Sequence, residues 1–321
     1  MGMLVEGKWQ NEDVKGFVRD GKSVRFSSGF HGAVREDGST EFKPEIGRYA
    51  LYYNRTCPWS HRAAVTLETK GLSDVIDQIF LEPARGEQSW WFGGTDEYSD
   101  PAIGATHLHE LYSASRSNFT GRVSVPILWD KKTEQIVNND SGAIARMFNC
   151  DFNKLAEFPE IDFYPEQHRA AIDELNDFVA ENLNDGVYRC LLAKSQTDYE
   201  TAFDKLFTAL DALDERLAGH RYLLGDKPTE PDWRLFAGLV RFDAVYYPAY
   251  KCNLKRIIDY PRLWDYTRDL YQLPNVAGTV DMVRIKAGYY GMISPSGIIP
   301  KGPILDFEEP HERTTLSWVA G

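Results

Sequence analysis

The chain has 321 residues and a formal net charge of −12, from 36 basic and 48 acidic side chains. This acidic balance argues against a nucleic-acid backbone or an anionic membrane surface as the main partner, although a local basic patch could still recruit an anionic ligand. With 43% hydrophobic residues, the composition is that of a globular protein long enough for two domains.

The sequence shows no sign of a membrane or secretory protein. No stretch approaches the roughly 18 apolar residues of a membrane span, and residues 1–10 lack the basic and apolar regions of a secretory signal. The cysteines form neither a zinc-like pair nor a disulfide framework, and we expect Cys150, Cys190 and Cys252 to be buried. We therefore predict a cytoplasmic protein with no metal and with no membrane or nucleic-acid partner.

The N-terminal half of the chain predicts an arm followed by a mixed α/β domain. Residues 1–46 are rich in glycine, serine and charge, so we expect an extended arm without its own core. Residues 47–150 alternate strand and helix signals around a small sheet. The expected strands are 48–53, 75–81, 123–130 and 134–137, the last two forming a hairpin, and the expected helices are 58–70, ended by Gly71, and 140–148.

A long segment, residues 83–120, interrupts this domain between its second and third expected strands. A connection of this length in a compact domain is usually functional or disordered. Trp90, Trp91 and Phe92 argue against disorder, because aromatic side chains favour burial. We predict an ordered but irregular insertion.

From about residue 165 onward the strand signals disappear. Residues 151–164 are read as a linker, and amphipathic helices with capping signals predict an all-α domain over 165–287. The proline-rich tail 288–321 is expected to be irregular and to pack back on the body. The predicted fold class is therefore α/β followed by all-α.

Cys57 lies where the first expected strand turns into a helix, with Pro58 at a tolerated early helical position. A thiol at a helix N-terminus meets unpaired N–H groups and the positive end of the helix dipole, and both favour the thiolate. His61 and Arg62 add positive charge. We predict a nucleophilic cysteine; the alternative, a buried structural cysteine, fits this position poorly. Ser60, three residues on, makes the motif monothiol.

Six ordered blocks resemble the Xi class of glutathione transferases, the glutathionyl-hydroquinone reductases. The blocks span nearly the whole chain, so the resemblance does not depend on the Cys-Pro motif alone. It implies a thioredoxin-like N-terminal domain, an all-helical glutathione-transferase C-terminal domain, and a homodimer formed through the helical domain. The blocks are NRTCPWSHR at 54–62, GRVSVPILWDKK at 121–132, IVNNDS at 136–141, DGVY at 185–188, RFDAVY at 241–246 and PSGIIPKGP at 295–303.

The resemblance implies a glutathione-dependent reduction of glutathionyl-hydroquinones. Cys57 would attack the sulfur of the conjugate, the hydroquinone would leave, and a mixed disulfide between Cys57 and glutathione would remain. A second glutathione would resolve this intermediate to glutathione disulfide, because Ser60 cannot act as a resolving thiol. The implied partners are glutathione, as co-substrate, and aromatic glutathionyl-hydroquinones.

The resemblance also implies which residues hold glutathione. Val125 and Pro126 are expected to form a cis bond that presents the backbone to glutathione, and a trans proline at a strand start is the alternative. Asp140 and Ser141 begin a helix, where they bind the γ-glutamyl group or simply cap the helix. The full implied set is Trp90, Arg122, Val125, Pro126, Asp140 and Ser141.

Some positions in this set are open, and one of them, Asp140, departs from the family, as do Ser60 and the residues around Tyr289 and Tyr290, including 291–294. Trp91 is a near-equal alternative to Trp90 as the residue that lies against glutathione, and Arg122 is expected to bind a glutathione carboxylate. Ser60 stands where the family usually has Ala, which keeps the site monothiol. Asp140 stands where the family usually has Glu, which shortens the carboxylate that would help to hold glutathione.

Three tyrosines are implied to line the aromatic pocket: Tyr188, Tyr246 and Tyr289, with Tyr290 as the alternative to the last. Their phenolic O–H groups could stabilise negative charge as the carbon–sulfur bond breaks. Core packing is the alternative for any one tyrosine in a chain that has 17. His61 either supports the thiolate or is simply solvated.

Two other functions fit the same residues. An omega-like thiol transferase or dehydroascorbate reductase would use the same cysteine on small disulfides. A non-catalytic member of the fold, which only binds ligands or partners, would leave Cys57 without a purpose.

Overall fold

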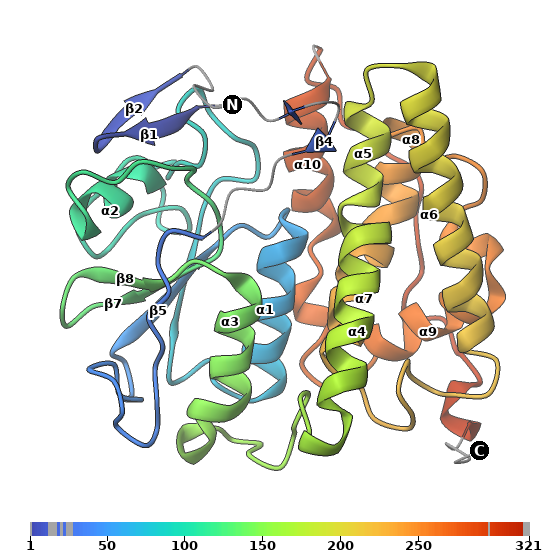
Figure 1. Ribbon diagram of the computed structural model, residues 1–321, viewed down its shortest axis with the longest axis horizontal. Coiled ribbons are helices and arrows are strands. Elements are labelled where there is room, and N and C mark those ends of the chain that lie inside the picture. The colour runs from blue at the N-terminus through green and yellow to red at the C-terminus, as the bar shows by residue number, and fades with distance from the viewer. Residues whose placement is uncertain (1, 12–17, 20–21, 24–27, 295, 317–321) are drawn as a thin grey trace. The chain divides into compact units, whose positions relative to one another are not determined.

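A four-stranded sheet lies at the centre of the first part of the chain in the computed structural model (Figure 1). Its strands are β5 (Tyr49–Tyr53), β6 (Asp77–Phe80), β7 (Ile127–Asp130) and β8 (Gln135–Asn138). They lie in the order β6-β5-β7-β8, and every pair is antiparallel except β5 with β6. The strands predicted for residues 47–150, and the hairpin, are confirmed. The structure describes residues 2–11, 18–19, 22–23, 28–294 and 296–316.

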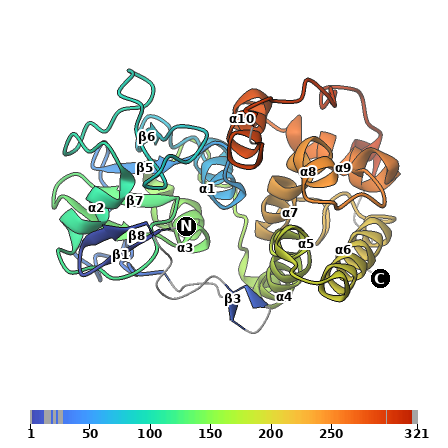
Figure 2. The ribbon, with the colours of Figure 1, turned by 90° about the horizontal axis from the view of Figure 1, so that it is seen from above.

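Helices cover both faces of this sheet. Helices α1 (Pro58–Thr69) and α3 (Ser141–Arg146) pack on one face, and α2 (Leu108–Ser115) packs on the other (Figure 2). Strand β7 begins later than the predicted residue 123, because Pro126 has no N–H to add to the ladder. Helix α1 ends as expected, with Gly71 following at φ +65°.

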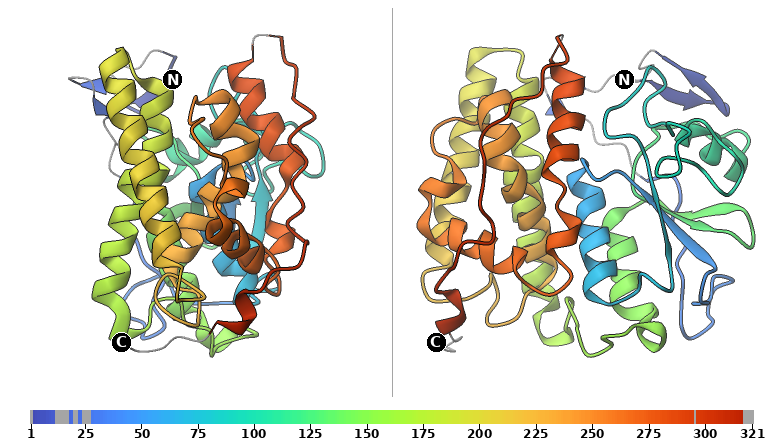
Figure 3. Two further views of the ribbon diagram at one scale, coloured as in Figure 1. Left: turned by 90° about the vertical axis from the view of Figure 1, so that its right-hand side faces the viewer. Right: turned by 180° about the vertical axis from the view of Figure 1, so that it is seen from behind.

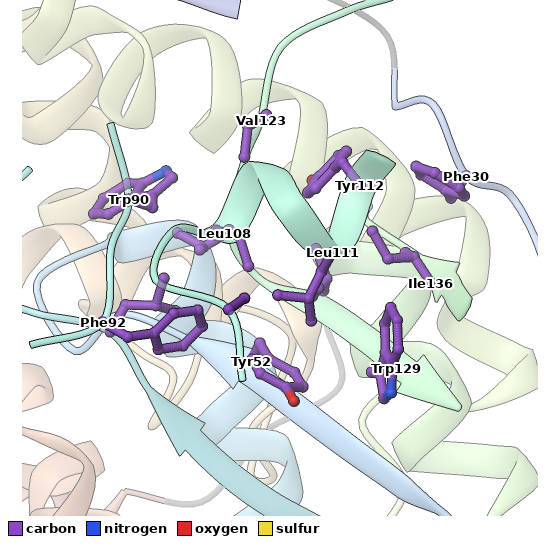
Figure 4. Packing of buried hydrophobic residues seen from close by; sticks show 14 of the residues in the cluster. Phe30, Tyr52, Trp90, Phe92, Leu108, Leu111, Tyr112, Val123, Trp129 and Ile136 are labelled. Atoms are coloured by element: carbon purple, nitrogen blue, oxygen red, sulfur yellow. The ribbon is translucent and has the colours of Figure 1, made fainter. Parts of the chain in front are cut away.

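The side chains of β5 alternate between the two faces. Tyr49, Leu51 and Tyr53 pack against α1 and α3, whereas Ala50 and Tyr52 face α2, as a period of two requires. Burying one such large side chain stabilises the fold by about 2 kcal/mol. We call the apolar group on the second face the α2-face cluster (Figure 4); it consists of Leu4, Phe30, Ala50, Tyr52, Cys57, Leu81, Trp90, Phe92, Ala105, Leu108, Leu111, Tyr112, Phe119, Val123, Val125, Ile127, Trp129 and Ile136.

The insertion is ordered around one carboxylate. Asp100 accepts hydrogen bonds from the N–H groups of Ala102, Ile103 and Ala105, and from the hydroxyl of Tyr52 at 2.6 Å. The segment before α2 is irregular, as expected. Helix α2 itself was not expected, because the insertion offered no clear helical period.

The N-terminal arm forms two short hairpins, β1 (Met3–Val5) with β2 (Lys8–Gln10) and β3 (Val18–Arg19) with β4 (Lys22–Ser23). Leu4 exchanges backbone hydrogen bonds of 2.9 and 3.0 Å with Gly121 and is fully buried in the α2-face cluster. The first hairpin therefore has no core of its own, and its Leu4 side chain packs into the α2-face cluster.

The rest of the chain is helical, and Figure 3 shows its helices. The chain divides into two compact units: residues up to Ile161 with Asp281–Ile299, and Asp162–Val280 with the residues from Pro300 on. The fold class, α/β with all-α, is confirmed, whereas the predicted domain limits stay a prediction. The helices are α4 (Arg169–Val179), α5 (Gly186–Leu192), α6 (Gln196–Arg216), α7 (Glu230–Arg241), α8 (Tyr247–Ala249), α9 (Pro261–Tyr271) and α10 (Met282–Ile293).

Short turns of 3-10 or π helix join these elements. The π-helical turns are η1 (Met147–Asp151), η4 (Ala180–Asn184) and η5 (Phe242–Tyr246). The 3-10 turns are η2 (Asn153–Leu155), η3 (Glu166–His168), η6 (Ile257–Asp259), η7 (Ala277–Thr279) and η8 (Arg313–Thr315). None of the described helices is both long and apolar enough to cross a bilayer.

Helix α10 corrects the prediction of an irregular tail from residue 288 onward. It continues to Ile293 and belongs to the first unit. Gly288 and Gly291 weaken the helical signal in the sequence. Tertiary packing overrides that weakness, because Ile285 and Tyr289, one turn apart, are both buried.

Candidate functional site

Cys57 occupies the turn between β5 and α1. It is the N-cap of α1, with φ −75° and ψ 123°, and its N–H donates to the carbonyl of Asn54 at 3.1 Å. Its Sγ lies 4.0 Å from the carbonyl oxygen of Val125, and the residue is only 9% exposed. The thiol therefore sits at the positive end of a helix in a largely dry setting.

The Val125–Pro126 bond that faces this thiol is cis, as expected. Val125 is buried in the α2-face cluster together with Cys57. Strand β7 follows directly, so the sheet fixes the position of this bond relative to the sulfur.

A buried tyrosine, Tyr112, fixes the residue before each of two candidate glutathione-binding segments. Its hydroxyl donates to the carbonyl of Ser124 at 2.8 Å, and accepts from the N–H of Ser124 and the side-chain amide of Asn139, both at 3.2 Å. Burial raises the pKa of Tyr112, so it stays protonated as a donor. We call Tyr112, Ser124 and Asn139 the Tyr112 network.

Sequence reasoning missed the Tyr112 network. An aromatic residue on the apolar face of a helix is predicted to be a core residue, and no sequence pattern indicates which groups its hydroxyl will bond. Asn139 lies inside one of the matched blocks, but its side chain points to the N-terminal arm: its Oδ1 accepts from the N–H groups of Gly29 and Phe30 at 3.1 and 3.0 Å.

Asp140 caps α3. Its Oδ1 accepts from the N–H groups of Gly142 and Ala143 at 2.9 and 2.8 Å. Ser141 is 5% exposed, and its hydroxyl accepts from Nε and Nη2 of Arg62 at 2.9 and 2.7 Å. The structure thus contains the capping geometry and brings a guanidinium of α1 to the start of α3, which the sequence suggested only as charge near the thiol.

Trp90, and not Trp91, belongs to the α2-face cluster with Cys57 (Figure 4). Trp90 is 4% exposed, and the guanidinium carbon of Arg85 lies 4.3 Å from its ring centroid. The indole N–H of Trp91 instead donates to the carbonyl of Ala84 at 3.0 Å. Trp90 is therefore the one of the two that shares a cluster with Cys57, and which of them lies against glutathione stays a prediction.

Arg122 is half-buried and follows Gly121, the residue that pairs with Leu4 of the N-terminal hairpin. It precedes Val123, which is buried in the α2-face cluster. Its proposed role toward a carboxylate stays a prediction.

Two polar residues of α1 are buried, because other elements cover the helix on most sides. His61 is 3% exposed, so it is not the solvated surface histidine of the alternative reading. Ser60 is fully buried, and among the described residues its Oγ has no hydrogen-bond partner. Cys150 is also corrected: it is exposed, because it falls in η1 beyond the packed part of α3.

Tyr289 lies on α10, in the same unit as Cys57, and is 2% exposed; Tyr290 is 8% exposed. Tyr188 and Tyr246 lie in the second unit with ring centroids 6.3 Å apart. Tyr250, which sequence reasoning missed, contacts both of these rings at 5.4 and 5.2 Å. Residues four apart on a helix lie on the same face, so the position of Tyr250 four residues after Tyr246 could have indicated this contact.

Comparisons with known proteins agree with this architecture. The family models for the glutathione S-transferase N-terminal and C-terminal domains match residues 56–149 and 167–269. Glutathionyl-hydroquinone reductase PcpF from Sphingobium chlorophenolicum is 41% identical, covering 94% of this chain and 96% of that protein. A Xi-class structure from Natrialba magadii has 40% identity and a TM-score of 0.91, covering 98% and 97% of the two chains. The glutathione-bound structure of YqjG from Escherichia coli K-12 has 37% identity and a TM-score of 0.87, covering 98% and 99%.

Proposed function

This chain belongs to the Xi class of the glutathione S-transferase family, and we propose that it reduces glutathionyl-hydroquinones with glutathione. The observation that carries the proposal is the thiol of Cys57, at the start of α1 and against the carbonyl that precedes cis-Pro126. A relative that is 41% identical over nearly its full length carries the name glutathionyl-hydroquinone reductase.

The reaction begins at the sulfur of the conjugate. The thiolate of Cys57 attacks that sulfur, a sulfur–sulfur bond forms, and the bond from sulfur to the aromatic carbon breaks. The electron pair goes to the ring, whose carbon then takes a proton, and the free hydroquinone leaves. Cys57 is left as a mixed disulfide with glutathione.

A second glutathione completes the cycle. Its thiolate attacks the glutathionyl sulfur of the mixed disulfide, which releases glutathione disulfide and returns Cys57 to the thiolate. Ser60 has no thiol, so this step needs the external thiol. The net change oxidises two glutathione units to one disulfide and reduces the conjugate to the hydroquinone.

The residues around Cys57 suit glutathione as the co-substrate. We propose that Val125 pairs with its backbone, that Trp90 lies against it, and that Arg122 binds one carboxylate. Asp140 and Ser141 would hold the γ-glutamyl group. Arg62, already bonded to the Ser141 hydroxyl, adds a positive charge there, which suits a carboxylate.

We assign Tyr188, Tyr246 and Tyr289 to the aromatic leaving group, as donors that stabilise charge while the bond to sulfur breaks. Core packing is the alternative role for each of the three, and substitution of each tyrosine by phenylalanine decides between the two roles. A homodimer through the helical domain and a cytoplasmic location are proposed on the family resemblance and the cysteine pattern alone.

The test is turnover of glutathionyl-menadiol in the presence of glutathione, followed by chromatography of free menadiol and glutathione disulfide. We expect both products in equal amounts, none with Cys57→Ala, and normal rates with Cys150→Ala, which removes an exposed thiol. No product from the unmodified protein would refute the proposal. Faster turnover of small disulfides or dehydroascorbate would instead indicate the omega-like thiol transferase.

A further inference from the structure

Helix α10 makes an unusually close contact with the turn that carries Cys57. A Cβ at Gly288 would lie 2.2 Å from Oγ1 of Thr56 and 2.5 Å from the carbonyl oxygen of Pro83. The same Thr56 hydroxyl donates to the carbonyl of Arg284, one turn earlier on α10, at 3.1 Å. Thr56 immediately precedes Cys57, and α10 lies beside α1 in two views (Figures 2 and 3).

One carboxylate joins the two sides of this contact. Glu97, in the insertion, accepts from both Nη2 of Arg284, at 2.6 and 2.7 Å to its two oxygens, and Nη1 of Arg55 at 2.7 Å. Arg284 also donates to the hydroxyl of Tyr98 at 2.6 Å and to Asp281 at 2.5 Å. We call Arg55, Glu97, Tyr98, Asp281 and Arg284 the Glu97 network.

The Glu97 network connects three segments that are far apart in sequence: the Cys57 turn, the insertion and α10. A network of several charges fixes geometry more firmly than an isolated surface pair. The side chains of Glu97 and Arg284 are 36% and 33% exposed, so the network remains open to screening by salt.

We propose that Glu97 is a positioning residue for the reaction: it holds α10, and with it Tyr289, at a fixed place beside the Cys57 turn. Tyr289 follows Gly288, where Thr56 leaves no room for a Cβ, so a shift of α10 moves the Tyr289 hydroxyl with it. Removing the Glu97 charge breaks its ion pairs with both Arg55 and Arg284, whereas the remaining pair of Asp281 with Arg284 lies at the start of α10 and does not reach across to the Cys57 turn. The catalytic part of this inference rests on the proposed function.

The first test reads the docking of α10 directly. Hydrogen exchange is measured by mass spectrometry on a peptide covering residues 282–293, in the unmodified protein, in Glu97→Gln and in Asp77→Asn. Asp77 is the matched control, a carboxylate paired with Lys131 at 2.5 Å in the same unit. We expect about tenfold faster exchange in Glu97→Gln alone. Unchanged exchange would overturn the proposal, whatever the enzyme turns over.

The second test separates positioning from general damage. Glu97→Gln should lower kcat/KM for glutathionyl-menadiol by about tenfold, and Glu97→Asp should recover part of it. Glutathionylation of Cys57 by glutathione disulfide, which needs no aromatic pocket, should stay within about twofold. In a Tyr289→Phe background, adding Glu97→Gln should lower kcat/KM for glutathionyl-menadiol only slightly further. A full additional tenfold loss of kcat/KM would overturn the link to Tyr289.

Two further outcomes remain decisive. If Glu97→Gln fails to fold, the exchange of residues 282–293 in the unmodified protein at low and high salt replaces it, and a salt-independent rate contradicts the proposal. If the unmodified protein does not act on glutathionyl-menadiol, the proposed function has failed, while the exchange measurement still decides whether Glu97 docks α10.

Discussion

The segment that precedes cis-Pro126 and helix α10 both meet the Cys57 turn, yet they are held there by different chemistry. The first is held by the Tyr112 network, whose buried hydrogen bonds involve no formal charge. The second is held by the Glu97 network, which is ionic and partly exposed. A buried neutral network gives rigidity that solvent does not reach, whereas an exposed ionic one can be tuned by salt and pH.

This difference suits the two substrates that we propose. Glutathione is the same molecule in both half-reactions, so its binding segments gain from a fixed geometry. The aromatic partner that we propose is placed on the side of α10, where docking by partly exposed charges allows a less rigid geometry. The following changes test whether the two sides really differ.

Asn139→Ala should have the largest effect. It removes the acceptor for the N–H groups of Gly29 and Phe30 and one donor to Tyr112, so we expect a loss of about 3 kcal/mol in the free energy of unfolding. Urea denaturation measures it, with the exposed Asn118→Ala as control. A loss of unfolding free energy no larger than that of the control would show that the Tyr112 network does not hold these segments.

Gly288→Ala should come next. The added methyl group cannot fit against Thr56 and Pro83 without a shift of α10, so we expect a loss of about 2 kcal/mol. Thermal and urea unfolding provide the measurement. Gly278→Ala, where nothing lies within 4 Å of the new Cβ, should be nearly neutral, and equal losses at the two glycines would contradict the close contact.

The pH dependence of the ionic side should be specific to Glu97. Hydrogen bonding from Arg284 lowers the pKa of Glu97, so its stabilising effect is present above the unfolded-state pKa and is lost as pH falls through the folded-state pKa. The difference in unfolding free energy between the unmodified protein and Glu97→Gln should therefore be larger at pH 7 than at pH 3. An equal difference at both pH values would argue against an ionic contact.

Ser60→Ala should have the smallest effect, and in the opposite direction. The Ser60 hydroxyl is buried, and no described residue partners it, so its removal should stabilise the fold by about 1 kcal/mol. Urea denaturation again gives the value. A clear loss of stability in Ser60→Ala would reveal a partner for that hydroxyl.

Local signals in the sequence predicted those features whose structure depends on a single short segment of the chain. The strand, turn and helix around Cys57, the glycine at the end of α1 and the Thr229–Asp232 capping box of α7 all have such signals, and all are present. At α6 the N-cap is Ser195, whose side chain accepts a hydrogen bond from the N–H of Asp198, although the hydroxyl of Thr197 fits the same sequence pattern.

Long-range contacts could not be predicted in this way. The burial of His61 depends on what packs around α1, and the Tyr112 network joins side chains from three segments. Helix α10 is stabilised by a contact between Thr56 and Arg284 across 228 positions of sequence, for which a single chain offers no signal. From the sequence alone, Glu97 is indistinguishable from a solvated surface carboxylate. Its role depends on Arg55 and Arg284, which only the fold brings to it.

The return of Asp281–Ile299 to the first unit has a consequence for how the protein is made. The first unit is not contiguous along the chain, so its sheet can form early during synthesis while α10 is still untranslated. The Cys57 turn then lacks its contact with α10 until the chain through Ile293 has been synthesised and has left the ribosome. A truncated or stalled product would carry the nucleophile without the helix that docks beside it.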